Sequence, residues 1–108
     1  MLVSYIDDLK RSIRKTEKEI LRIEEEVGLN RIIKSEIKAK FAKKKKYEKA
    51  VDDAKIALRK LNDLLKEYNT IVFNLTFDQI KEEKENKKLN KIEEKFMDIY
   101  NSAKKNLV

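Results

Sequence analysis

Large apolar residues recur at alternating intervals of three and four residues along most of this chain, and this spacing constrains its fold more than any other feature. The spacing places apolar side chains on one side of an α-helix, whereas a half-buried β-strand needs alternation at every second residue. The chain contains no proline and only one glycine, so almost no residue interrupts a helix. The sequence therefore predicts an all-α protein built from long amphipathic helices.

The first apolar series predicts a helix over residues 5–27. Its members are Ile6, Leu9, Ile13, Thr16, Ile20, Ile23 and Val27. Ser4 precedes the series and is a suitable N-cap residue, and Gly28 follows the series directly. A glycine at this place is typical of the left-handed residue that ends many helices. We therefore expect the helix to begin after Ser4 and to end before Gly28.

Two further series predict helices over residues 31–73 and 77–106. They comprise Tyr47, Val51, Ala54, Leu58, Leu61, Leu65, Tyr68, Val72 and Leu75, and then Leu89, Ile92, Phe96, Ile99 and Ala103. Thr76 and Gln79 fit a capping box at the start of the third helix. Residues 81–88 carry no apolar side chain, but their helix propensity favours a solvated helix over a frayed loop.

Helices of this length are expected to fold back on one another through short connections. Residues 1–108 would then form a single elongated domain of antiparallel helical hairpins, a coiled-coil-like three-helix bundle. The first helix would pair with the first half of the long helix and the third helix with its second half, with a thin overlap near residues 45–53. A break in the long helix at residues 42–46 would instead produce a compact four-helix arrangement, and the sequence leaves both arrangements open.

The long helix carries apolar residues beside its main series. They are Ile56, Leu64, Ile71 and Phe73. These residues widen the apolar stripe beyond the need of a two-helix contact, so a third helix is the natural element to cover the extra surface. The same four residues are our candidate interface for a protein partner or for a second copy of the chain.

The excess positive charge is concentrated in residues 31–50, which carry nine basic and two acidic residues in a chain of net charge +7. The candidate anion contacts in this basic segment are Lys38, Lys40, Lys43, Lys44, Lys45, Lys46 and Lys49. Lysines of this kind suit the phosphates of a nucleic acid without reading its sequence. The other interpretation is a solvated stretch where two sub-bundles meet. Lys40 and Lys44 fall in the apolar register of the helix, where lysine weakens pairing.

The residue types that most catalytic and metal sites need are missing. The chain has no histidine and no cysteine, and its single glycine excludes glycine-rich phosphate-binding loops. Adjacent carboxylates such as Asp7 and Asp8 diverge by about 100° on a helix and cannot converge on one metal ion. We therefore expect no enzyme activity, no metal, no cofactor and no small-molecule substrate.

The sequence contains no run of about 18 apolar residues, and its first 30 residues are charged throughout. We therefore expect no transmembrane helix, no signal peptide and a cytoplasmic protein that does not act on membranes. The favoured function is a coiled-coil interaction protein, such as a scaffold, adaptor, chaperone-like partner or inhibitor, that binds a protein partner or itself. The alternative is an accessory nucleic-acid-binding protein that uses residues 38–49.

Overall fold

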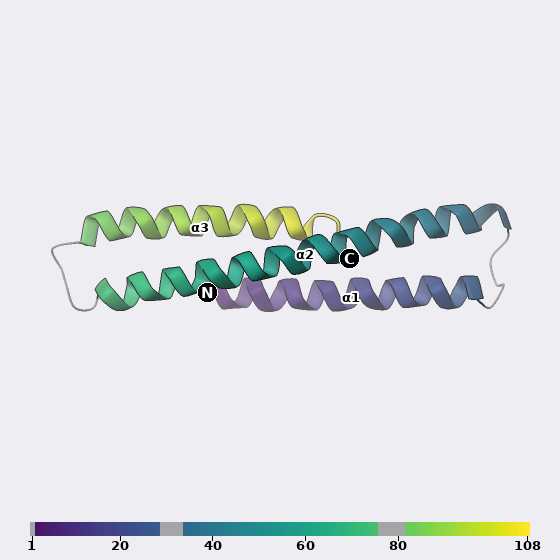
Figure 1. Ribbon diagram of the computed structural model, residues 1–108, viewed down its shortest axis with the longest axis horizontal. Coiled ribbons are helices and arrows are strands. Elements are labelled where there is room, and N and C mark those ends of the chain that lie inside the picture. Colours follow the sequence, from purple (N-terminus) through teal and green to yellow (C-terminus); the bar gives the residue numbers. More distant parts are fainter. Residues whose placement is uncertain (1, 29–33, 76–81) are drawn as a thin grey trace.

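The computed structural model describes residues 2–28, 34–75 and 82–108, which form three long helices. They are α1 (Leu2–Gly28), α2 (Lys34–Leu75) and α3 (Glu82–Lys104). α1 and α3 run in the same direction, and α2 runs antiparallel to both (Figure 1). The molecule is a rod whose principal dimensions are 68 × 16 × 15 Å. The prediction of an all-α, elongated bundle of antiparallel hairpins is therefore confirmed.

α2 is a single helix of 42 residues that runs through residues 42–46 without a break. At about 1.5 Å per residue it is about 63 Å long, close to the full length of the rod. The compact four-helix arrangement is therefore wrong. Residues 42–46 are one alanine and four lysines, which are all good helix formers. In addition, an ion pair between Lys44 and Glu24 ties this part of α2 to α1.

The two ends of α1 differ from the prediction. The helix begins at Leu2, so Ser4 lies inside the first turn and is not the N-cap residue. Gly28 is the last helical residue, and its backbone is not left-handed. A β-carbon at Gly28 would meet no atom within 4 Å. The prediction for Gly28 is therefore wrong, because glycine adopts ordinary helical dihedral angles as readily as left-handed ones.

Other boundary predictions fall partly outside the described residues. These are the start of the long helix at residues 31–33, the capping box of Thr76 and Gln79, and the start of the third helix at residues 77–81. From Glu82 onward the chain is helical, and the side chains of residues 86–88 are exposed. This agrees with a solvated helix over that stretch.

The core lies where all three helices run side by side. It comprises Ile6, Leu9 and Ile13 of α1, Val51, Ala54, Leu61 and Leu64 of α2, and Ile92, Phe96 and Tyr100 of α3. Phe96 is completely buried, and the Tyr5 ring packs edge-on against it with the ring centroids 6.4 Å apart. The expectation of a thin overlap near residues 45–53 is therefore wrong. The stripe of α2 is wide enough to pack against both neighbours, so the three helices share one core.

Polar contacts also join α1 directly to α3. The Asp8 carboxylate accepts hydrogen bonds from the Tyr100 hydroxyl and the Lys104 ammonium group. Arg11 lies 3.8 Å from the other carboxylate oxygen of Asp8. The hydrogen bond from Lys104, followed by the one from Tyr100, lowers the pKa of Asp8 below its ordinary value of 3.8. These contacts hold the first half of α1 against the last turns of α3.

Thr16 is the one polar member of the apolar series of α1, and its side chain is fully buried. Its hydroxyl donates a hydrogen bond of 2.8 Å to the carbonyl oxygen of Ser12. The same hydroxyl accepts a hydrogen bond of 3.0 Å from the backbone N–H of Val108. Both hydrogen-bonding roles of the buried hydroxyl are therefore satisfied, and the end of the chain after α3 is held against α1.

Candidate interaction site

Two lysines of the basic segment are committed to ion pairs within the protein. Lys40 Nζ lies 3.3 Å from Glu26 Oε2, and Lys44 Nζ lies 3.1 Å from Glu24 Oε1. Lys44 also lies 3.5 Å from Glu48 on its own helix. The hydrogen bond to Glu24 raises the pKa of Lys44 above its ordinary value. The acidic end of α1 therefore accommodates the two lysines that interrupt the apolar register of α2.

The remaining five candidate lysines are exposed. They are Lys38, Lys43, Lys45, Lys46 and Lys49. Within the residues that the structure describes, none of these five forms an ion pair. The Lys43 ammonium lies 5.7 Å from the centroid of the Tyr47 ring, which is the range of a cation–π contact. Lys43, Lys46 and Lys49 line one concavity together with Asn106, which follows α3.

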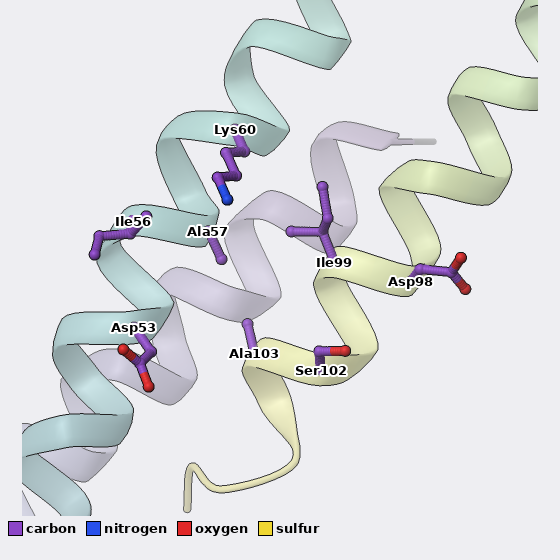
Figure 2. Close-up of a pocket in the computed structure, with 8 residues that line it drawn as sticks. All are labelled: Asp53, Ile56, Ala57, Lys60, Asp98, Ile99, Ser102 and Ala103. Atoms are coloured by element: carbon purple, nitrogen blue, oxygen red, sulfur yellow. The ribbon is translucent and has the colours of Figure 1, made fainter.

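This concavity continues into a groove between α2 and α3. The middle of the groove is lined by Asp53, Ile56, Ala57 and Lys60 of α2 and by Asp98, Ile99, Ser102 and Ala103 of α3 (Figure 2). Beyond it, the lining continues with Asp63, Leu64, Glu67 and Lys95. Asp53 lines both of the first two parts, and Lys60 and Ile99 line both of the last two. We call this continuous surface the α2–α3 groove.

Figure 2 shows how the side chains lie in the middle of this groove, with α1 behind it. Ala57, Ile99 and Ala103 turn toward the space between α2 and α3. Ile56 instead projects from the side of α2 that faces away from α3, and 54% of its surface is exposed. The exposed side chain of Ile56 therefore lies beside a shallow apolar surface formed by Ala57, Ile99 and Ala103.

Seven residues of α2, with Ile56 in the middle, repeat the helical spacing of three and four and therefore share one face of the helix. We call them the outer stripe, and they are Lys46, Lys49, Asp53, Ile56, Lys60, Asp63 and Glu67. All seven are exposed, and all seven line the α2–α3 groove. In the described parts of the chain, none of the six charged members takes part in an ion pair.

On the side of α2 that faces α1, by contrast, lysines form ion pairs with glutamates of α1. Lys40 and Lys44 are paired with glutamates of α1, and Lys55 lies 3.9 Å from Glu17. Three lysines on the side of α2 that faces α1 therefore pair with glutamates of α1, whereas the six charged members of the outer stripe form no ion pair within the described residues.

The structure separates the four residues of the candidate partner interface. Leu64 is only 9% exposed and belongs to the core, so the third helix covers it. Ile71 is partly buried against the core, and Phe73 is 65% exposed near the end of α2, outside the groove lining. Ile56 is the exposed member at the edge of the groove lining, on the side of α2 that faces away from α3.

Four residues of the outer stripe were not selected from the sequence. They are Asp53, Lys60, Asp63 and Glu67. The signal that finds them is a second three-and-four spacing, offset from the apolar series of α2 and filled mainly with charges of both signs. Such a stripe resembles an ordinary solvated helix face until its neighbours are known.

The described residues contain no group of three or more acidic side chains that could hold a metal ion. Among the same residues, no helix is long and apolar enough to cross a membrane. Comparison with known protein families, with curated proteins and with solved structures finds no match for this chain. The candidate site therefore comprises one exposed isoleucine and six charged residues that form no ion pair within the described part of the chain.

Proposed function

We propose that this protein is a non-enzymatic helical interaction protein and that the α2–α3 groove is its working surface. Roles as a scaffold, adaptor, chaperone-like partner or inhibitor all use such a surface. The observation that carries the proposal is the outer stripe, in which Ile56 is exposed among six charged residues that the described chain leaves unpaired.

The groove suits a helix of a binding partner. Burial of Ile56 would remove apolar surface from water, which favours association. The fixed order of charges along the outer stripe would then select the direction and position of the bound helix, since like charges in contact are unfavourable. α2 is already a continuous helix, so its binding face is formed before the partner arrives.

Cross-linking of the full chain with a lysine-reactive reagent tests this proposal. Intermolecular cross-links are expected at Lys46, Lys49 and Lys60, whether the second chain is another copy or a different protein. The substitution Ile56→Glu should remove these cross-links. Leu21→Glu is the matched control, because Leu21 of α1 is equally exposed, at 57%. Intermolecular cross-links that spread evenly over all exposed lysines would contradict the proposal.

A second function, sequence-independent binding of nucleic acid, is favoured by one observation. Lys43, Lys46 and Lys49 line one concavity with Tyr47, which places three cations beside an aromatic ring. Cations of this kind contact phosphates, and an aromatic ring stacks on bases. Lys40 and Lys44 already pair with glutamates of α1, so the proposal rests on the other five of the seven candidate lysines.

Fluorescence anisotropy with a labelled DNA oligonucleotide at ~50 and ~200 mM salt tests this second function. Replacing Lys43, Lys46 and Lys49 together with glutamine should weaken binding at least about tenfold, and higher salt should weaken the wild type steeply. The control replaces three exposed lysines of α1, Lys10, Lys15 and Lys18, and removes the same charge. Equal losses in both triple variants would mean that only net charge matters.

A further inference from the structure

The outer stripe is complementary to itself, and we infer that two copies of the chain associate through α2 in an antiparallel dimer with twofold symmetry at Ile56. This inference rests on the proposed function, because it names the partner of the same surface. In such a dimer, a residue before Ile56 in one copy faces the residue an equal distance after Ile56 in the other.

Counting outward from Ile56, every step in the outer stripe matches a basic residue with an acidic one. Asp53, three residues before Ile56, faces Lys60, four residues after it. Lys49 and Asp63 each lie seven residues from Ile56 and face each other. Lys46, ten residues before Ile56, faces Glu67, eleven residues after it. A mismatch of one residue is about 1.5 Å along a helix, which these long side chains can span. Each pair occurs twice in a twofold dimer, so all six charges of each copy find a partner.

Other alignments of two such helices place like charges together. A parallel pair would set each residue beside its own copy. An antiparallel pair moved by one heptad in one direction would set Lys60 against Lys60 and Asp53 against Glu67. Moved by one heptad in the other direction, it would set Asp53 against Asp53 and Lys46 against Lys60. The charge order therefore favours one direction and one register.

The charges and the exposure of the outer stripe in the single chain are also consistent with an antiparallel dimer. The six charged residues of the outer stripe form no ion pair within the described chain, so dimer formation breaks none. Ile56, the exposed aliphatic residue, lies at the centre and would pack against its own copy. The stripe is about 32 Å long, which gives roughly 500 Å² per copy, at the low end for a specific interface. The dimer should be reversible and weakened by salt.

Charge reversal at one pair tests the register. Lys49→Glu alone and Asp63→Lys alone each create like-charge contacts at both copies of the pair, so each should raise the dissociation constant of the dimer at least about tenfold. An equimolar mixture should form a heterodimer, because both pairs again join opposite charges. The measurement is sedimentation equilibrium at low salt, with one variant fluorescently labelled. The control mixture combines Asp63→Lys with Lys18→Glu, an exposed lysine of α1. Lys18→Glu alone should dimerise as the wild type does, and its heterodimer with Asp63→Lys should be weaker than the Lys49→Glu heterodimer, because one of its two pairs still joins like charges.

A cysteine at the symmetry point provides a second test. The chain contains no cysteine, and a residue on a twofold axis faces itself, so Ile56→Cys should form a disulfide-linked dimer on mild oxidation. Leu21→Cys, at an equally exposed aliphatic position of α1, should remain unlinked. Circular dichroism confirms that each variant keeps its helix content.

The outcomes separate this inference from the proposed function. A wild-type protein that is monomeric at all concentrations overturns the dimer, while cross-links from the outer stripe to a different protein would keep the groove as the working surface. A dimer unaffected by both charge reversals overturns the register. A monomer that binds DNA through Lys46 and Lys49 assigns these residues to phosphates and also overturns the dimer. The absence of both self-association and stripe-centred cross-links would overturn the proposed function as well.

Discussion

At the scale of single residues, Phe96 of α3 is a core side chain that contacts α1. Its ring is completely buried, and Tyr5 packs against its edge. Phe96→Ala leaves a cavity and should lower the free energy of unfolding by about 3–5 kcal/mol. Phe41→Ala is the matched control, because Phe41 is 44% exposed and its loss should cost less than about 1 kcal/mol. Urea denaturation followed by circular dichroism measures both, and equal losses would contradict the central position of Phe96.

Asp8 makes the stability of the protein depend on pH. Hydrogen bonds from Lys104 and Tyr100 lower the pKa of Asp8 in the folded protein below 3.8. A carboxyl group with a lowered folded pKa stabilises the fold above its unfolded pKa, and this stabilisation is lost as the pH falls through the folded pKa. Asp8→Asn should therefore be less stable than the wild type at pH 7, and the difference should shrink below about pH 4.

The measurement is the free energy of unfolding of both proteins from pH 7 down to pH 3. Asp7→Asn is the control, since the Asp7 side chain is exposed and forms no ion pair with the described residues. A constant difference between Asp8→Asn and the wild type across the whole range would show that Asp8 does not gain its stabilisation from the charged form.

At the scale of the helices, the end of α1 offers a direct test of its backbone conformation. Gly28 is helical, and a β-carbon there would meet no atom within 4 Å. Gly28→Ala should therefore raise the free energy of unfolding by about 0.5–1 kcal/mol, because alanine loses less conformational entropy in a helix. Chemical denaturation measures the change. A decrease of similar size would show that Gly28 is left-handed in solution.

The faces of α2 differ in what they contact, although their composition is similar. Lys44 and Lys55 face glutamates of α1, whereas Lys49 and Lys60 lie in the outer stripe and are unpaired in the described chain. Lysines eleven residues apart lie about three turns apart and share a helix face, so the division follows from the helical repeat once the position of α1 is known. The function proposed for the outer stripe depends on this division.

At the scale of the whole molecule, the rod differs in thickness along its length. The first half of α1, the middle of α2 and the second half of α3 run side by side, whereas the rest of α1 lies beside α2 alone toward one end and the rest of α3 lies beside α2 alone toward the other, among the described residues (Figure 1). Local opening is cheapest where few apolar contacts must be broken. Backbone amides near Leu9, Ala54 and Phe96 should therefore exchange with deuterium at least about tenfold more slowly than those near Val27 and Lys40. Exchange measured by NMR tests this, and uniform protection would contradict it.

The sequence was sufficient to predict three helices and most of their buried residues. Ile6, Leu61 and Phe96 lie on the predicted stripes, and all three are buried. The sequence was not sufficient for the candidate site. Leu64 was selected for a partner but is covered by α3, and Asp63 of the outer stripe was not selected at all. Neither the burial of Leu64 nor the exposure of the outer stripe could be predicted from the sequence, because the spacing of a helix identifies its faces but not the element that covers each face.

What the sequence determined by itself was the set of helices, because helix formation depends on local backbone hydrogen bonds and on a repeat visible within a few turns. The tertiary structure decided how far α1 and α3 slide along α2. That offset depends on side chains distant in the sequence, such as Asp8 meeting Tyr100 and Thr16 meeting Val108. The same offset places Glu24 beside Lys44 and leaves the outer stripe without a partner inside the described chain. The surface proposed for function is therefore a consequence of how the helices are aligned.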